Sequence, residues 1–196
     1  VFLLAALFYD SVRTRLIISL IFGVGTMAWP YSKTFFPEPL VGLTLSTGVL
    51  FLCVYARRRK IILLAAAGAS FAIAIITKLV IIPVIGLCLI YVLLLSGFPA
   101  RRKIWESAVF LLIPLIALTL IGVYNYTRFG NIYDSGYQES FIPQHVFTGL
   151  YGFLLSPGKS IFIYSPILVI SALMSISFFR KFKREAVLLF ATVIYI

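Results

Sequence analysis

The chain of 196 residues is 62% hydrophobic and 12% charged, with a mean hydropathy of +1.08 and a net charge of +11. A soluble domain has about 45–50% apolar residues, so this composition excludes water as the main solvent. The basic residues form short clusters between long uncharged runs. That pattern is typical of membrane topology and argues against nucleic acid as a partner.

Six uncharged runs follow one another at residues 16–32, 39–56, 61–77, 79–100, 107–127 and 160–179. Each approaches or exceeds the roughly 17–25 residues that cross a bilayer as a helix. Residues 1–9 and 186–196 are expected to be two further spans that are cut short. The sequence therefore predicts an all-α fold, a polytopic transmembrane helical bundle with six complete spans plus two truncated ones. We expect a single partial domain, 1–196, truncated at both ends.

The basic clusters predict the orientation of these spans. They fall at every second connection between runs, at Arg13 and Arg15, 57–60, 101–103 and 180–184, and they hold 13 of the 17 Lys and Arg residues. The positive-inside rule assigns this side to the cytoplasm. The outer side receives the other four basic residues, Lys33, Lys78, Arg128 and Lys159, which topology does not explain.

The first outer turn, residues 29–40, combines aromatic side chains with Lys33 and Glu38. Pro39 marks a helix start, where the helix dipole favours a carboxylate. One interpretation is a capping glutamate within an interfacial aromatic belt. The other is a site at the membrane surface for a phosphate head group and a hydroxylated acceptor.

Lys78 interrupts a stretch that is otherwise uncharged from residue 61 to residue 100. It is expected at an outer turn, where it either extends to the interface or binds a lipid phosphate. On the preceding helix, small residues that include Gly68 are expected to allow close helix packing.

The longest outer segment, residues 124–159, is too long for a structureless loop and is rich in aromatic residues. Pro143 stands where a helix could begin, and Pro157 stands where it would end. Val146, Phe147, Leu150 and Leu154 form an apolar stripe at helical spacing. The segment is therefore expected to contain an interfacial or re-entrant helix.

Four separated segments, residues 29–40, 77–78, 124–137 and 149–166, resemble stretches of bacterial and archaeal membrane glycosyltransferases in the same order. These enzymes form the C-type (GT-C) superfamily, which includes protein mannosyltransferases and the lipid A aminoarabinose transferase. The resemblance implies an inverting glycosyltransferase in the cytoplasmic (inner) membrane, with its active site facing outward. Its partners would be a polyprenyl-phosphate-linked sugar, the bilayer and an acceptor that is a glycan, lipid or protein.

The resemblance also implies roles for particular residues. Glu38 is similar to an acidic catalytic position of an outer loop, and the principal catalytic acid of the family would lie before Val1. Lys78 is similar to a basic position at a later outer turn. The expected substrate-binding residues are Lys33, Lys78, Arg128, Asp134 and Lys159. Neither a cofactor nor a metal site is indicated.

Two other functions stay open. A transporter or flippase would also be polytopic and basic on the inside, but it should have ionisable groups in the middle of the bilayer. Here the full spans are uncharged between their ends, which favours chemistry at the membrane surface. A non-catalytic cell-envelope assembly protein that kept the fold is the second alternative.

Overall fold

The computed structural model describes residues 1–95, 99–134, 136, 146–158 and 160–195. All regular structure in this part of the chain is helical, which confirms the all-α prediction. The chain groups into two compact units, which are described separately. The first contains Val1–Phe36 and Tyr137–Phe182, and the second contains Pro37–Gly136 and Lys183–Ile196. The single domain stays a prediction.

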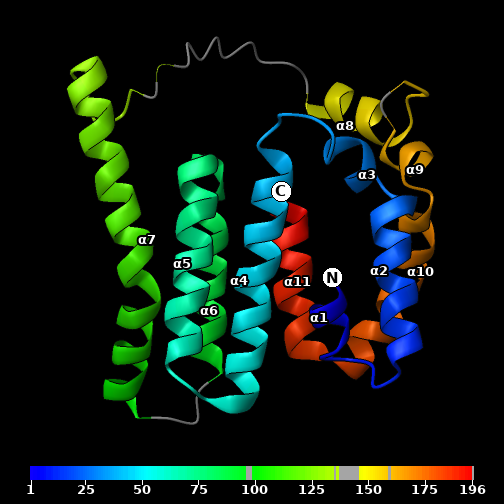
Figure 1. Cartoon of the computed structure of the whole chain (residues 1–196), viewed down its shortest axis with the longest axis horizontal. Coiled ribbons are helices and arrows are strands. Elements are labelled where there is room, and N and C mark those ends of the chain that lie inside the picture. The colour runs from blue at the N-terminus through cyan, green and yellow to red at the C-terminus, as the bar shows by residue number, and fades with distance from the viewer. Residues whose placement is uncertain (96–98, 135, 137–145, 159, 196) are drawn as a thin grey trace. The chain divides into compact units, whose positions relative to one another are not determined.

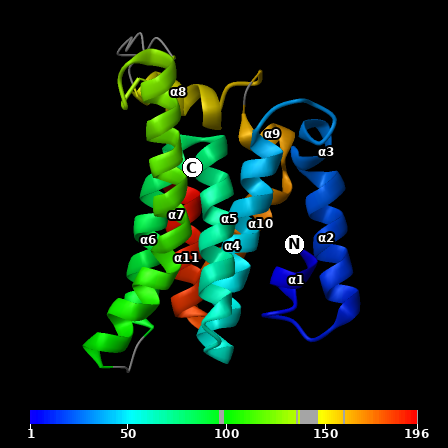
Figure 2. The same cartoon turned by 60° about the vertical axis from the view of Figure 1, so that its left-hand side comes forward.

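The second unit is a bundle of long helices. Its elements are α4 (Glu38–Arg58), α5 (Ile62–Thr77), the 3-10 helix η1 (Leu79–Ile81), α6 (Ile82–Leu94), α7 (Ala100–Phe129) and α11 (Lys183–Tyr195). Helix α5 packs against both α4 and α7, and α6 packs against α7 and α11. Two views show α4 and α5 side by side (Figures 1 and 2).

Local sequence sets the ends of these helices. Pro39 lies in the first turn of α4, and Pro99 directly precedes α7, where a missing N–H costs no helical hydrogen bond. At the other ends, Arg59 (φ 55°) and Gly130 (φ 72°) adopt the left-handed conformation that closes many helices. The charged residues near Arg59 therefore lie at the end of α4, after its apolar run.

The core of the second unit depends on two glycines of α4 and α5. A Cβ atom on Gly68 would lie 2.4 Å from the carbonyl oxygen of Phe110 in α7. That oxygen has lost its usual helical donor, because Pro114 has no N–H. A Cβ atom on Gly48 would lie 2.8 Å from the ring of the fully buried Phe71. The predicted close packing at Gly68 is therefore confirmed.

The first unit consists of shorter helices: α1 (Phe2–Ala5), α2 (Val12–Gly25), α3 (Ala28–Tyr31), α8 (Val146–Leu154), α9 (Ile161–Tyr164) and α10 (Ile167–Lys181). Two predicted spans are interrupted here. Thr26 is extended between α2 and α3, and its hydroxyl donates to the carbonyl of Phe22 (2.6 Å). Pro166 separates α9 from α10, because the residue before a proline disfavours helix.

Helix α8 fulfils one detail of the prediction for the long outer segment. It covers Val146–Leu154, where the apolar stripe predicted a helix, and it ends before Pro157. The predicted start at Pro143 lies outside the described residues. An interfacial location for α8 stays a prediction.

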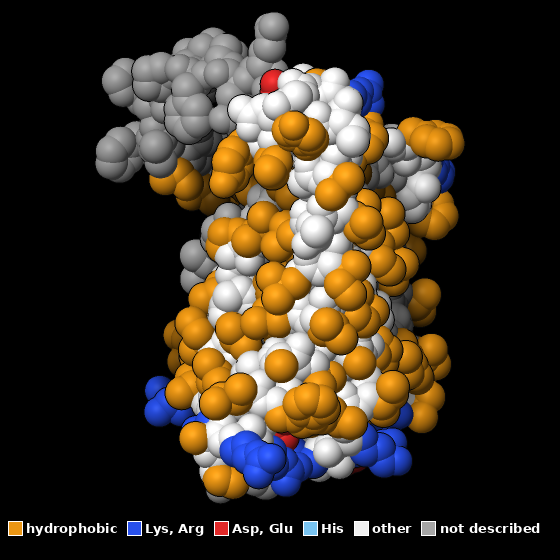
Figure 3. Space-filling view, turned by 90° about the vertical axis from the view of Figure 1, so that its left-hand side faces the viewer, with side chains coloured by type: hydrophobic (Ala, Val, Ile, Leu, Met, Phe, Trp, Pro, Cys, Tyr) orange, Lys and Arg blue, Asp and Glu red, His pale blue; other side chains and the backbone are white. Residues whose placement is uncertain are grey.

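Among the described residues, two helices are long and apolar enough to cross a membrane, α4 and α7. Helix α5 has 16 residues and α6 has 13, which is short of the roughly 17–25 residues of a full span. The flank of α7 away from the bundle exposes an apolar stripe at helical spacing, formed by Leu112, Ile116, Leu120 and Val123. Figure 3 shows apolar side chains covering this side of the molecule. Such a large exposed apolar surface is typical of contact with lipid or protein.

Three basic segments meet at one end of the second unit, which we call the basic end: 57–60, 101–103 and 183–184. The guanidinium of Arg59 donates to the carbonyl of Leu95 (2.8 Å), which links the end of α4 to the end of α6. Lys183 and Arg184 line a cavity together with Leu95. Lys and Arg side chains gather at the lower edge of Figure 3. Which side of a membrane this end faces stays a prediction.

Candidate functional site

Glu38 and Lys78 meet at the end of the second unit opposite the basic end. Glu38 is the first residue of α4 and follows Pro37. Lys78 lies between α5 and η1 with an extended backbone (φ −149°, ψ 114°). Its N–H donates to the carbonyl of Ala74, and its carbonyl accepts from Ile81, so both backbone groups are satisfied. The turn therefore holds the backbone of Lys78, while its long side chain extends toward α4.

The side chains of these two residues form an ion pair. Lys78 Nζ donates to Glu38 Oε1 at 2.5 Å. The side chain of Lys78 is 37% exposed and that of Glu38 is 43% exposed. The hydrogen bond from Lys78 is the main cause that lowers the pKa of Glu38 below its usual value of 4.5, and a bond from its own backbone N–H adds to it. Glu38 is therefore ionised at neutral pH.

The pair keeps capacity for a ligand. An ammonium group has three N–H donors, and Glu38 uses one of those of Lys78. A carboxylate has about four acceptor positions, and the bonds from Lys78 and from the backbone N–H of Glu38 use two of them, so Glu38 can also accept from a hydroxyl group. This arrangement can present a cation and a hydrogen-bond acceptor side by side at a partly exposed helix end.

Arg128 lies elsewhere in the second unit and has local contacts. It stands in the last turn of α7, where its guanidinium lies over the rings of Tyr124 (5.7 Å) and Phe129 (5.4 Å). It also donates to the hydroxyl of Tyr124. These contacts hold Arg128 along the surface of its own helix.

Asp134 shapes the turn that follows α7. Its carboxylate accepts from the backbone N–H of Gly136 (2.8 Å), and Gly136 has a positive φ of 75°. The buried amide of Asn125 donates to the carbonyl of Ile132 (3.1 Å), which folds this turn back against the helix. A structural role therefore accounts for Asp134 in this structure.

Arg128 and Asp134 are displaced along the bundle from the ion pair. The parallel helices α5 and α7 cross where Gly68 meets Phe110. From that point α5 continues for about 14 Å and α7 for about 28 Å, at 1.5 Å per residue. Within the described part of the chain, no hydrogen bond or ion pair connects Arg128 or Asp134 to Glu38 or Lys78. The expected grouping of all four residues is not observed.

The remaining two predicted residues are Lys33 and Lys159, and neither lies in the described part of the second unit. Lys33 belongs to the first unit, and its ammonium lies 4.7 Å from the centre of the Trp29 ring. This is the geometry of a cation–π contact at an aromatic belt. Lys159 lies outside the described residues. The described residues contain no group of three or more His, Cys, Asp or Glu side chains that could hold a metal ion. The expectation that neither a cofactor nor a metal site is indicated stays a prediction.

Sequence reasoning missed a buried ion pair at the basic end. Glu106 is 3% exposed and accepts from Arg102 Nε at 3.0 Å. The spacing of four residues between Arg102 and Glu106 was the available signal, since such pairs share a helix face. Sequence reasoning also missed a cavity between α6 and α11 with Tyr91 in its wall. Nothing in the sequence indicated that these two helices are neighbours.

Comparisons of this chain with protein-family models, curated proteins and solved structures found no match. Membership of the C-type glycosyltransferases therefore stays a prediction that rests on the sequence segments described above.

Proposed function

We propose that this chain is part of a membrane glycosyltransferase that moves a sugar from a polyprenyl-phosphate donor to an acceptor hydroxyl. The observation that carries the proposal is the contact between Glu38 and Lys78, which are 40 residues apart in the sequence. The sequence predicts a role in this reaction for both residues independently of their contact. A cation beside an ionised carboxylate suits a donor that has a phosphate and an acceptor that has a hydroxyl.

The two residues would have different tasks. In the transfer, the acceptor oxygen bonds to the anomeric carbon, the bond from that carbon to the phosphate oxygen breaks, and the acceptor loses its proton. Lys78 would stabilise the negative charge that develops on the departing lipid phosphate. Glu38 would hold Lys78 and accept a hydrogen bond from the acceptor. Because the lowered pKa makes Glu38 a weak base, we assign the proton of the acceptor hydroxyl to the carboxylate of the principal catalytic residue that the resemblance implies.

The distribution of charge supports this reaction over transport. Glu106 is a buried charged residue of the second unit, and it is paired with Arg102 at the basic end. A transporter is expected to have ionisable groups near the middle of its helices. Glu38 and Lys78 lie at helix ends and stay partly exposed, as a substrate at the membrane surface requires.

The proposal can be tested by transfer assays with lipid-linked sugar in the full-length protein. Lys78→Ala should lower turnover at least about tenfold, which is roughly 1.4 kcal/mol of transition-state stabilisation. Lys78→Arg should keep part of the activity, because it retains the charge. Lys60→Ala is the matched control, since it removes an exposed lysine at the basic end.

A double-mutant cycle separates the two tasks. If Glu38 acts partly by holding Lys78, the effects of the two substitutions overlap. The turnover of the double variant Glu38→Gln/Lys78→Ala should then be higher than the product of the two single effects predicts. A folded Lys78→Ala protein with wild-type turnover would refute the phosphate role of Lys78. Loss of activity in Lys60→Ala of the same size would show that the assay reports only general damage.

A further inference from the structure

Helices α6 and α11 of the second unit enclose a cavity of about 400 Å³. It is lined by Leu87, Ile90, Tyr91, Leu94, Leu95, Lys183, Arg184, Val187, Leu188 and Ala191. Its walls are almost entirely apolar, and its volume lies in the range of about 300–1,000 Å³ that is usual for ligand sites. Ile90, Leu94 and Val187 are each more than half exposed, so the cavity opens along its side as a groove.

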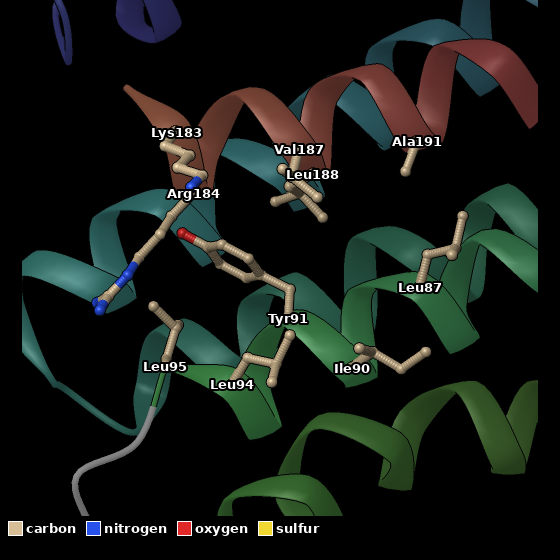
Figure 4. Close-up of a pocket in the computed structure, with 10 residues that line it drawn as sticks. All are labelled: Leu87, Ile90, Tyr91, Leu94, Leu95, Lys183, Arg184, Val187, Leu188 and Ala191. Carbon is tan, nitrogen blue, oxygen red and sulfur yellow. The ribbon is translucent and has the colours of Figure 1, made fainter. Parts of the chain in front are cut away.

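One end of the groove is basic. Lys183 and Arg184 leave the first turn of α11 beside Leu95, and both are exposed. Figure 4 shows these two side chains together at one end, with Leu87 and Ala191 at the other. The groove therefore combines a cationic end with a long apolar wall. These two parts match the anionic head group and the acyl chains of an anionic lipid.

Tyr91 gives the groove a polar group without a partner. Tyr91 is 8% exposed, and its buried hydroxyl has no hydrogen-bond partner among the described residues. In Figure 4 the hydroxyl of Tyr91 points toward the side chains of Lys183 and Arg184. Buried hydroxyl groups are usually hydrogen-bonded, so Tyr91 has a donor that the described residues leave unused at the basic end of the groove.

We propose that the groove binds an anionic glycerophospholipid. Its phosphate would accept hydrogen bonds from Lys183, Arg184 and the hydroxyl of Tyr91. One acyl chain would lie along the apolar wall toward Ala191. The open side of the groove lets a lipid enter from a surrounding bilayer, and the basic segments 57–60 and 101–103 at the same end add attraction for an anionic head group.

This site is distinct from the Glu38–Lys78 pair. Lys78 precedes η1 and Leu95 follows α6, and the 13 residues of α6 alone extend for about 20 Å. The lipid would join α11 to α6 and the basic end, far from the proposed transfer reaction. Its binding can therefore be measured without any activity assay.

The test is lipid titration of the purified full chain in nonionic detergent, followed by native mass spectrometry. The probes are phosphatidylglycerol and phosphatidylcholine with identical acyl chains. We expect one phosphatidylglycerol to bind at least about tenfold more tightly than phosphatidylcholine, a difference of roughly 1.4 kcal/mol. Equal affinity for the two lipids would overturn the proposal, as would the absence of a bound lipid, which would mean that protein covers the groove.

Three variants locate the site. Lys183→Gln/Arg184→Gln should weaken phosphatidylglycerol binding about tenfold and leave phosphatidylcholine binding unchanged. Ala191→Trp should fill the apolar end and weaken both lipids. Tyr91→Phe removes only the hydroxyl, keeps the packing, and should weaken phosphatidylglycerol severalfold.

The matched control is Arg101→Gln/Lys103→Gln, which removes two positive charges from the same end without touching the groove. Its phosphatidylglycerol affinity should stay within about twofold of wild type. If this control weakens binding as much as Lys183→Gln/Arg184→Gln does, the lipid is held by the general charge of this end, and the groove site is wrong. Full binding by both Tyr91→Phe and Ala191→Trp would refute it equally.

Discussion

Helices α5 and α2 lie largely in two of the uncharged runs, 61–77 and 16–32, but they pack very differently. Helix α5 buries eight residues, and Leu64, Ala67, Phe71, Ala74 and Ile75 have no exposed surface. Helix α2 buries none, and Leu20 and Val24 are each more than 60% exposed. The presence of a long uncharged run therefore does not by itself decide whether a helix is buried.

The difference lies in the shape of the two helix surfaces. Helix α5 has alanines around Gly68, and their small side chains let the backbone of α7 approach closely. Helix α2 also contains Gly23, but a Cβ atom there would have no neighbour within 4 Å. A glycine signals close packing only when a partner helix uses the space. Substitution by alanine should distinguish the two cases, because it should lower stability at Gly68 and raise it at Gly23.

The largest effect is expected for Gly68→Ala. The new Cβ atom would lie 2.4 Å from the carbonyl oxygen of Phe110, and neither backbone can move without separating α5 from α7. We expect a loss of about 3 kcal/mol in the free energy of unfolding, at the upper end of typical overpacking costs. Titration with denaturing detergent, followed by circular dichroism, measures it.

Gly86→Ala is the control for this experiment, because the space next to Gly86 in α6 is open. It should leave stability unchanged or raise it by up to about 1 kcal/mol, since alanine favours helix over glycine. Equal destabilisation by both substitutions would show that the crossing at Gly68 is looser than described.

A smaller loss is expected for Gly48→Ala in α4. Here the obstacle is the ring of Phe71, 2.8 Å from the new Cβ atom, and a ring can turn more easily than a backbone. Phe71 is nevertheless fully buried and packs edge-on against Phe110, with ring centres 5.8 Å apart. We expect a loss of about 1–2 kcal/mol in the same titration. A combined Gly48→Ala/Phe71→Leu variant should recover part of it.

Much of the fold could be predicted from sequence because uncharged runs and basic clusters are local signals. The runs at 39–56 and 107–127 became α4 and α7, and Pro39 marked the start of α4. Interruptions at Thr26 and Pro166 were missed, because hydropathy alone does not register a turn inside an apolar run. Six spans stay a prediction, since two described helices reach spanning length.

The candidate site was only partly predictable. Glu38 and Lys78 stood out as charges beside apolar runs, and the turn positions at helix ends brought them into contact. Arg128 and Asp134 looked equivalent to them in sequence. Their separation arises from the greater length of α7 past its crossing with α5, a property of packing that no short motif encodes. The groove at Tyr91 depends on a contact between α6 and α11 and was equally out of reach.

Gly23→Ala in α2 is expected to act in the opposite direction to Gly68→Ala. With no atom within 4 Å of the new methyl group, only the helix preference changes. We expect α2 to gain about 0.5–1 kcal/mol of local stability. Hydrogen exchange of the α2 amides reports this local change, whereas global unfolding would not isolate it. Faster exchange in the variant would mean that α2 packs closely against a partner.

The smallest effect concerns the pH dependence of the Glu38–Lys78 pair. The hydrogen bond from Lys78 lowers the pKa of Glu38 below 4.5, its value without such partners. Glu38 is then a group with a depressed folded-state pKa. Its contribution to stability is fully present above about pH 4.5 and is lost as the pH falls through the lower, folded-state pKa. Because both side chains are substantially exposed, solvent screens the pair and keeps the change small.

Comparing wild type with Lys78→Met isolates this contribution. A carboxyl ¹³C NMR titration should show the pKa of Glu38 rising toward 4.5 when Lys78 is replaced, with its own backbone N–H still holding it slightly below. Lys60→Met is the matched control, since Lys60 is an exposed lysine at the basic end of the same unit. It should leave the titration of Glu38 unchanged. If Lys78→Met does not move the pKa of Glu38, the two side chains do not form the ion pair, and the site that depends on their contact has to be abandoned.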